Sequence, residues 1–175
     1  ENHAHPGLEI VYLLGRFGTA VDGTDVRVTE EPRSLSLGDW VPRGLAFFAG
    51  SVVYRRKARL THLPGEFLFL QVPDYRGVAV RVVVNGKSAG IIAWEPNELD
   101  ITACLPEGTS EADIRVEVLG HRRNSHGPLH HAKKWPVWTG PVEFVTQGAD
   151  WTDEYQLVPC GLMKPPIVIT RKPVR

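Results

Sequence analysis

The sequence lacks an excess of charge of either sign and lacks any long hydrophobic run. Its 20 basic and 20 acidic residues cancel when histidines are neutral, whereas a protein that binds DNA or RNA ordinarily carries a basic excess. No stretch approaches the roughly 18 apolar residues of a membrane-spanning helix, and no signal-peptide hydrophobic region opens the chain. We therefore expect neither a nucleic acid nor a membrane among its partners.

Cysteine is also scarce, since Cys104 and Cys160 are the two that the chain contains. Neither lies in a CxxC pair or in a spacing typical of metal ligands. Both have apolar neighbours, which favours buried free thiols, although the sequence does not exclude a disulfide between them. The location stays open between secretion from a bacterium and its cytoplasm.

Glycine and proline, by contrast, are abundant, with 17 and 14 of the 175 residues. The dominant hydrophobic period is two, which indicates strands joined by turns. About ten short strands in a chain of this length favour an all-β fold, an antiparallel β-sandwich of the jelly-roll type. The expected strands cover 8–17, 25–28, 52–61, 67–72, 78–84, 89–93, 98–102, 114–119, 142–145, 155–158 and 167–170. A single helical turn is the most that 107–113 can hold.

Two of these strands and one turn allow a more specific expectation. Residues 67–72 are nearly all apolar, which predicts a strand buried on both faces. Asn85-Gly86 supplies the two positive-φ residues of a type I′ turn and predicts a hairpin. In 52–61 the alternation leaves Arg55, Lys57 and Arg59 on a solvated outer face, while Arg56 is a charge on the otherwise apolar face.

The chain begins at Glu1 rather than at Met, which favours a processed product or a domain cut from a longer protein. We expect a disordered lead-in over 1–7, a single β-sandwich module over 8–170 and a polar tail over 171–175. No internal repeat and no linker divides the module.

Three segments resemble the galactose-binding-like modules attached to bacterial glycoside hydrolases. Gly38-Asp39-Trp40 with Gly44–Tyr54 is similar to a "GxPFYxGxxxY" pattern, with Ala46 in place of Pro and Phe48 in place of Tyr. Val84–Lys87, Gly90, Trp94-Glu95-Pro96 and Leu99–Thr102 resemble a "VNGKxxGxxxxxPxxxDIT" run. Arg122–His131 is similar to an "NxLGPHH" signature. The resemblance implies a jelly-roll module of a larger glycosidase, with a carbohydrate ligand and the parent's catalytic domain as partners.

The segment from His121 to Pro141 has no strand pattern and carries the candidate binding residues, because long loops often hold function. An exposed aromatic can stack on a pyranose ring, and imidazole, amide and guanidinium groups can bond its hydroxyls. The candidate sugar-binding residues are Trp135, Trp138, Arg122, Asn124, His126, His130 and His131. Adjacent His130 and His131 point apart in extended chain, so a metal is disfavoured. Trp94 is expected to cover the sandwich edge.

Catalysis by this chain alone is disfavoured, since no acid–nucleophile setting surrounds the candidate carboxylates Glu95, Glu98, Asp100, Asp150, Asp153 and Glu154. No catalytic residue is assigned. The resemblance implies that no cofactor is required. Such modules often hold a structural calcium ion, but the sequence contains no dense acidic loop to bind one. Three hypotheses remain: a carbohydrate-binding module, an ancillary domain that only packs against a catalytic domain, and a stand-alone hydrolase or lyase.

Overall fold

The structure is a computed structural model, and it describes residues 13–135 and 138–172. Its strands are β1 (Gly18–Asp22), β2 (Asp25–Thr29), β3 (Ser51–His62), β4 (Phe67–Gln71), β5 (Tyr75–Arg76), β6 (Ala79–Val84), β7 (Lys87–Ile92), β8 (Glu98–Asp100), β9 (Gly108–Leu119), β10 (Gly161–Leu162) and β11 (Ile167–Arg171). The helical elements are α1 (Arg123–His126) and the 3-10 turns η1 (Val41–Arg43), η2 (Thr102–Cys104) and η3 (Pro141–Glu143). Within these ranges no helix is long and apolar enough to cross a membrane.

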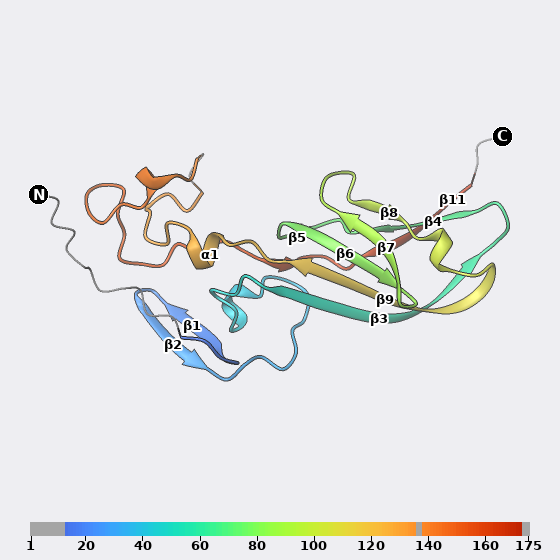
Figure 1. Cartoon of the computed structure of the whole chain (residues 1–175), viewed down its shortest axis with the longest axis horizontal. Coiled ribbons are helices and arrows are strands. Elements are labelled where there is room, and N and C mark those ends of the chain that lie inside the picture. Colours follow the sequence, from blue (N-terminus) through green and yellow to red (C-terminus); the bar gives the residue numbers. More distant parts are fainter. Residues whose placement is uncertain (1–12, 136–137, 173–175) are drawn as a thin grey trace, which may run out of the picture.

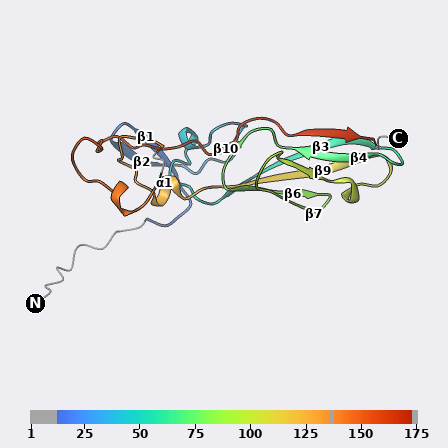
Figure 2. The ribbon, with the colours of Figure 1, turned by 90° about the horizontal axis from the view of Figure 1, so that it is seen from above.

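Two antiparallel sheets form the sandwich. One has the strand order β3-β9-β6-β7 and the other β11-β4-β8. Two small pairs, β1-β2 and β10-β5, complete the strands. The predicted all-β, antiparallel sandwich class is therefore confirmed, while the jelly-roll assignment stays a prediction. Figure 1 shows the sandwich at one end of an elongated molecule, with β1, β2 and α1 at the other, and Figure 2 shows the same division from above.

The core lies between the two sheets and follows the period of two. In β6, Val80, Val82 and Val84 have no exposed surface, and Arg81 between them is exposed. The same alternation buries Ala112, Ile114, Val116 and Val118 in β9 and Leu68 and Leu70 in β4. Alternating side chains point to opposite faces of a strand, so each sheet presents an apolar face to the other.

The hairpin predicted at Asn85-Gly86 is confirmed. Both residues have positive φ, 52° and 77°, and they join β6 to β7 through the pair Val84 and Lys87. The register shifts by one residue between Val82 and Val83, which is a bulge in the returning strand. The turn thus follows from local sequence, as two positive φ values require residues that tolerate them.

The outer face of β3 is solvated, as predicted, but the acidic residues of β9 offset its basic charge. The guanidinium of Arg55 donates to both carboxylate oxygens of Asp113, at 2.7 and 3.0 Å. Lys57 pairs with Glu111 at 3.0 Å, and both pairs join strands that are adjacent in the sheet. Hydrogen bonds from Arg55 and Arg115 hold the pKa of Asp113 below its ordinary value.

Several predicted elements are wrong. Residues 142–145 begin in the 3-10 turn η3, and 155–158 form no strand. For residues 107–113 the expected limit of one helical turn holds, since β9 begins at Gly108 and no turn forms there. Within 8–17, residues 13–17 form no strand and the earlier ones lie outside the described residues; β1 starts at Gly18. Arg171, expected in the tail, is the last residue of β11, while 1–7 and 173–175 are not described.

Two further expectations concerned burial, and both are wrong. β4 is buried on one face only, because Phe67 and Phe69 turn away from the core; the guanidinium of Arg171 lies 4.4 Å from the Phe69 ring centre. Trp94 is 79% exposed. It begins a turn closed by the amide of Asn97 donating to its carbonyl at 3.2 Å, and this turn directs the indole outward instead of over the sandwich edge.

The segment 38–40 is anchored to 160–162 by backbone and side-chain hydrogen bonds. The amide of Gly38 donates to the carbonyl of Leu162 at 2.7 Å, and that of Trp40 donates to Cys160 at 2.9 Å. The carboxylate of Asp39 accepts the Cys160 amide at 3.0 Å. Trp40 is buried in the core.

Both cysteines are free; Cys160 is buried as expected and Cys104 half-buried, and burial raises the pKa of the Cys160 thiol.

Candidate functional site

Residues 121–159 leave the sandwich at the end of β9 and return just before β10; we call them the excursion. The excursion closes on itself at a neck made by His121, Asn124, Val158 and Pro159. The Asn124 side chain donates to the Val158 carbonyl at 2.8 Å and accepts its amide at 2.9 Å. His121 Nε2 lies 3.2 Å from the Pro159 carbonyl oxygen. Asn124 is 2% exposed, so its two hydrogen bonds to Val158 are buried, while His121 Nδ1 has no hydrogen-bond partner among the described residues.

Beyond the neck, two stretches of the excursion run side by side. The Gln156 amide donates to the Leu129 carbonyl at 2.7 Å, and the Thr152 amide to His130 at 2.9 Å. His131 and Trp151 form an isolated antiparallel bridge. The sequence predicted a strand over 155–158. Instead, hydrogen bonds between two distant segments of the excursion hold the backbone there, and no sheet forms.

Aromatic rings fill the space between these stretches. The His130 imidazole stacks on Trp151 with ring centres 4.9 Å apart, and the Tyr155 ring lies 4.6 Å from it on a tilt. Tyr155 meets Phe47 edge-on at 5.5 Å. His130 Nδ1 lies 3.2 Å from the Thr152 carbonyl oxygen; since a carbonyl only accepts, Nδ1 carries the proton. His130 is thereby fixed in orientation.

One side of this cluster opens into a hollow of about 260 Å³, the aromatic hollow, with almost entirely apolar walls. It lies between the stretch that follows α1, the stretch that follows η3, and Trp151. Its lining residues are Gly127, Pro128, Leu129, His130, His131, Glu143, Phe144, Val145, Thr146 and Trp151. Glu143 Oε2 accepts the Gly140 amide at 2.6 Å, and Phe144 is half exposed. An apolar hollow with few polar groups is the usual form of a small-ligand site.

Comparison with known proteins finds structures but neither families nor curated proteins. No family model and no curated protein matches the chain. A rhamnosidase from Novosphingobium sp. PP1Y is 21% identical with a TM-score of 0.50, over 93% of this chain and 15% of that one. A glycosyl hydrolase family 2 member from Bacteroides cellulosilyticus DSM 14838 is 14% identical with a TM-score of 0.46, over 92% and 19%.

The likeness is one of fold. A putative beta-galactosidase from Bacteroides fragilis is 20% identical with a TM-score of 0.45, over 83% of this chain and 19% of that one. This chain thus spans less than a fifth of each of the three structures. The rhamnosidase match covers the excursion as well as the sandwich, since it extends over 93% of the chain.

The structure brings together only part of the predicted sugar-binding set. His130 and His131 line the aromatic hollow. His131 is buried, and its Nδ1 accepts the Lys133 amide at 3.1 Å. Asn124 is committed to the neck. His126 is exposed with Nδ1 2.8 Å from Ser125 Oγ, and Arg122 is exposed.

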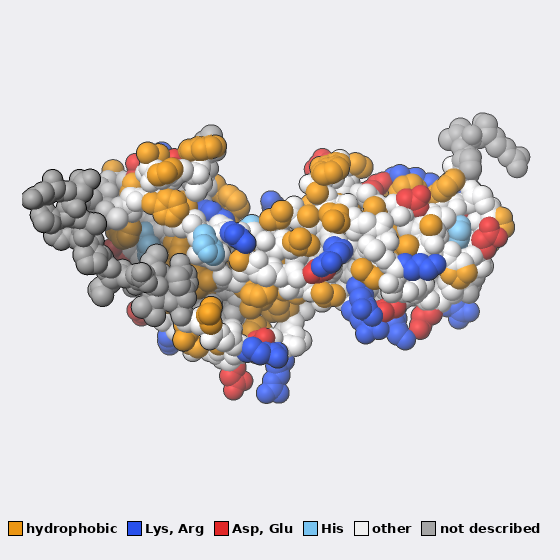
Figure 3. Space-filling model, in the orientation of Figure 1, with side chains coloured by type: hydrophobic (Ala, Val, Ile, Leu, Met, Phe, Trp, Pro, Cys, Tyr) orange, Lys and Arg blue, Asp and Glu red, His pale blue; other side chains and the backbone are white. Residues whose placement is uncertain are grey.

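Trp135 and Trp138 are both solvent-exposed, 64% and 72%. Residues 136 and 137 between them lie outside the described residues. Figure 3 shows hydrophobic side chains gathered at the upper left, over the excursion. The large exposed apolar side chains there are Trp135, Trp138, Val142 and Phe144. Of these four, Phe144 lines the aromatic hollow and the other three do not.

Sequence reasoning missed Glu143, Phe144, Trp151 and Tyr155 as site residues. The sequence predicts strands over 142–145 and 155–158, which removes Glu143, Phe144 and Tyr155 from the candidate loop. One signal was present, because five of the fifteen aromatic residues fall between positions 135 and 155. Such a concentration within a segment lacking strand periodicity indicates a local aromatic cluster.

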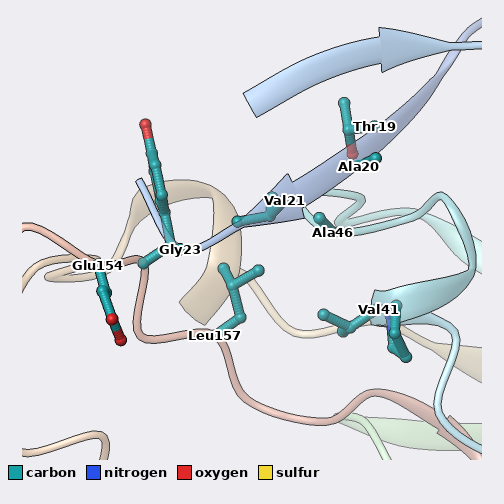
Figure 4. A pocket seen from close by; sticks show the side chains of 10 residues that line it. Thr19, Ala20, Val21, Gly23, Val41, Ala46, Glu154 and Leu157 are labelled. Carbon is teal, nitrogen blue, oxygen red and sulfur yellow. The ribbon is translucent and has the colours of Figure 1, made fainter. Parts of the chain in front are cut away.

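A second hollow, of about 290 Å³, lies between β1 and residues 154–157 (Figure 4). Figure 4 shows the side chains of Val21 and Leu157 pointing toward one another, and Glu154 is the one carboxylate among the lining residues. Glycoside hydrolysis requires two carboxyl groups that flank one bond. In the described chain neither this hollow nor the aromatic hollow is lined by more than one.

Three of the other candidate carboxylates serve the fold. Glu98 pairs with Arg171 at 2.5 Å, Asp100 accepts the Thr102 amide, and Asp153 accepts the Trp151 indole N–H at 2.9 Å. Across residues 13–135 and 138–172, no group of three His, Cys, Asp or Glu side chains is placed to hold a metal ion.

Proposed function

We propose that this chain is a non-catalytic module of a larger glycoside hydrolase and binds carbohydrate at the aromatic hollow. The fold likeness to a small part of a rhamnosidase, together with the three sequence segments described above, supports a module within a glycosidase. The mechanism is binding without bond cleavage.

The aromatic hollow is the observation that carries this proposal. Its volume of about 260 Å³ suits a single sugar ring. One face of a pyranose is lined by C–H groups, which pack well on an aromatic or apolar wall such as Phe144 and Trp151. Glu143 and His131 at the wall provide a carboxylate and an imidazole for the hydroxyls. The zero net charge of the chain suits a neutral ligand.

Isothermal titration of the chain with neutral mono- and oligosaccharides, rhamnose and galactose among them, tests the proposal. We expect Phe144→Ala to weaken the binding about tenfold, since an aromatic contact contributes roughly 0.5–1.5 kcal/mol beyond the area it buries. Phe67→Ala is the matched control, because Phe67 is a similarly exposed phenylalanine on β4, away from the hollow. No heat from any saccharide, or equal effects of both variants, contradicts sugar binding here.

A second function, docking on a catalytic domain of the same enzyme, is favoured by the exposed apolar side chains of the excursion. Large clustered apolar surface marks protein contacts more often than free surface. Hydroxyl-radical oxidation of Trp135 and Trp138 distinguishes the two functions. Docking predicts that both indoles are protected in the full-length enzyme without sugar, whereas sugar binding at the aromatic hollow, which neither indole lines, predicts that both stay reactive there.

A further inference from the structure

Arg56 stands out because it occupies a core-facing position in β3. Val52, Tyr54, Ala58 and Leu60 share its face of the strand and pack against the core, and Ile114 is its partner in the β9 register. Its neighbours Arg55 and Lys57, on the outer face, each bind an acid of β9. No hydrogen bond or ion pair joins the side chain of Arg56 to any other described residue, and Arg56 is exposed. A charged side chain beside a core normally reaches water or a partner.

The space beside Arg56 is a cavity of about 700 Å³ between the two sheets, the inter-sheet cavity. It opens where β3 and β11, each the outermost strand of its sheet, face each other. Its inner wall is core: Leu70, Ile114, Val116, Leu162 and Val168. The volume lies within the roughly 300–1,000 Å³ of small-molecule sites. It is larger than the volumes of the two hollows described above.

A fixed segment covers the mouth of the cavity. Residues 33–37 line it from outside the sheets. One guanidinium nitrogen of Arg43 donates to the Ser36 carbonyl at 3.0 Å, to Ser36 Oγ at 2.6 Å and to the Leu37 carbonyl at 3.0 Å. The cover is therefore tied to η1, and the cavity is a built feature of the fold.

The charges around the cavity are of one sign. Arg33 and Arg56 line it, and no carboxylate does. Arg55 also lines it but is already bound to Asp113. Both this cavity and the aromatic hollow have apolar walls, so the guanidiniums without a partner among the described residues are what distinguish the inter-sheet cavity. An apolar interior beneath two guanidiniums suits a molecule with an apolar body and one oxyanion.

From this geometry we propose that the inter-sheet cavity binds a small amphipathic carboxylate or sulfonate. The apolar body lies between the sheets against Leu70 and Val116, and the oxyanion binds Arg56 and Arg33. The proposal is independent of sugar binding, because the two sites share no residue.

Two fluorescent probes with the same aromatic body test this. 8-Anilinonaphthalene-1-sulfonate carries the oxyanion, and N-phenyl-1-naphthylamine is its neutral counterpart. We expect Arg56→Gln to weaken binding of the sulfonate about tenfold, the effect of losing one charge-assisted hydrogen bond, and to leave the neutral probe unchanged. Arg59→Gln, on the outer face of the same strand, should change neither.

Ala58→Leu locates the probe, because its larger side chain enters the cavity and should weaken both probes. Phe144→Ala should weaken neither, which separates this site from the aromatic hollow. Circular dichroism checks that each variant is folded. Equal effects of Arg56→Gln and Arg59→Gln on the sulfonate, or full-strength binding in a folded Ala58→Leu variant, overturns the proposal.

Discussion

Replacing Asn124 by alanine tests the neck of the excursion. The change removes two short hydrogen bonds and leaves both the amide and the carbonyl of Val158 without their partner. Val158 is itself buried, and each unsatisfied buried backbone group costs about 1–3 kcal/mol. Water can reach part of this site once the side chain is shortened, so we expect a loss of about 2–4 kcal/mol in the free energy of unfolding.

Urea unfolding followed by circular dichroism and tryptophan fluorescence measures this loss. For a chain of this size it corresponds to a melting temperature lowered by roughly 5–15 °C. Ser125→Ala is the control, because Ser125 is the next residue and its hydroxyl makes only exposed contacts, with the Arg122 carbonyl at 3.3 Å and His126 Nδ1 at 2.8 Å; its effect should stay within about 0.5 kcal/mol. If Asn124→Ala destabilises the chain no more than this control, the neck does not hold the excursion.

Two further predictions concern the sandwich. Asp113 has a lowered pKa in the folded chain, so its pairing stabilises the fold above its ordinary pKa and the contribution is lost as pH falls through the folded pKa. Asp113→Asn should therefore lower the melting temperature at about pH 6 and have little effect at about pH 2; a difference that is the same at both would contradict this. Gly161→Ala should cost about 2 kcal/mol more than Gly65→Ala in chemical unfolding, since both have positive φ but only at Gly161 would the added Cβ meet the Gly38 carbonyl oxygen; equal losses would refute the clash.

The sequence predicted those parts of the fold that depend on neighbouring residues. The Asn85-Gly86 hairpin forms because its turn is chosen by two adjacent residues. β3 and β9 were predictable because apolar and polar residues alternate along each strand, which gives the sheet one apolar face. The exposure of Trp94 was not predictable in this way, because a turn closed by Asn97 sets the direction of its indole.

The site was predicted only in part, for a related reason. His130 and His131 were chosen for their chemistry, and both line the aromatic hollow. Phe144 and Trp151 reach the same hollow from separate stretches of the excursion, which the neck and the bridge between His131 and Trp151 bring together. Such pairing depends on contacts between distant residues, so no local period signals it. Asn124 shows the converse, because its amide suits a sugar but bonds Val158.

Because the excursion closes at the neck, its length can change without changing the geometry of the sandwich. Asn124 and Val158 are 34 positions apart in sequence yet directly bonded, so the chain leaves and re-enters the scaffold at one point. Doubling the length of a closed loop costs only about 0.6 kcal/mol of closure entropy. Insertions and deletions between these two residues are therefore inexpensive, and the hollow can be remodelled for another ligand while the strands beneath it keep their register.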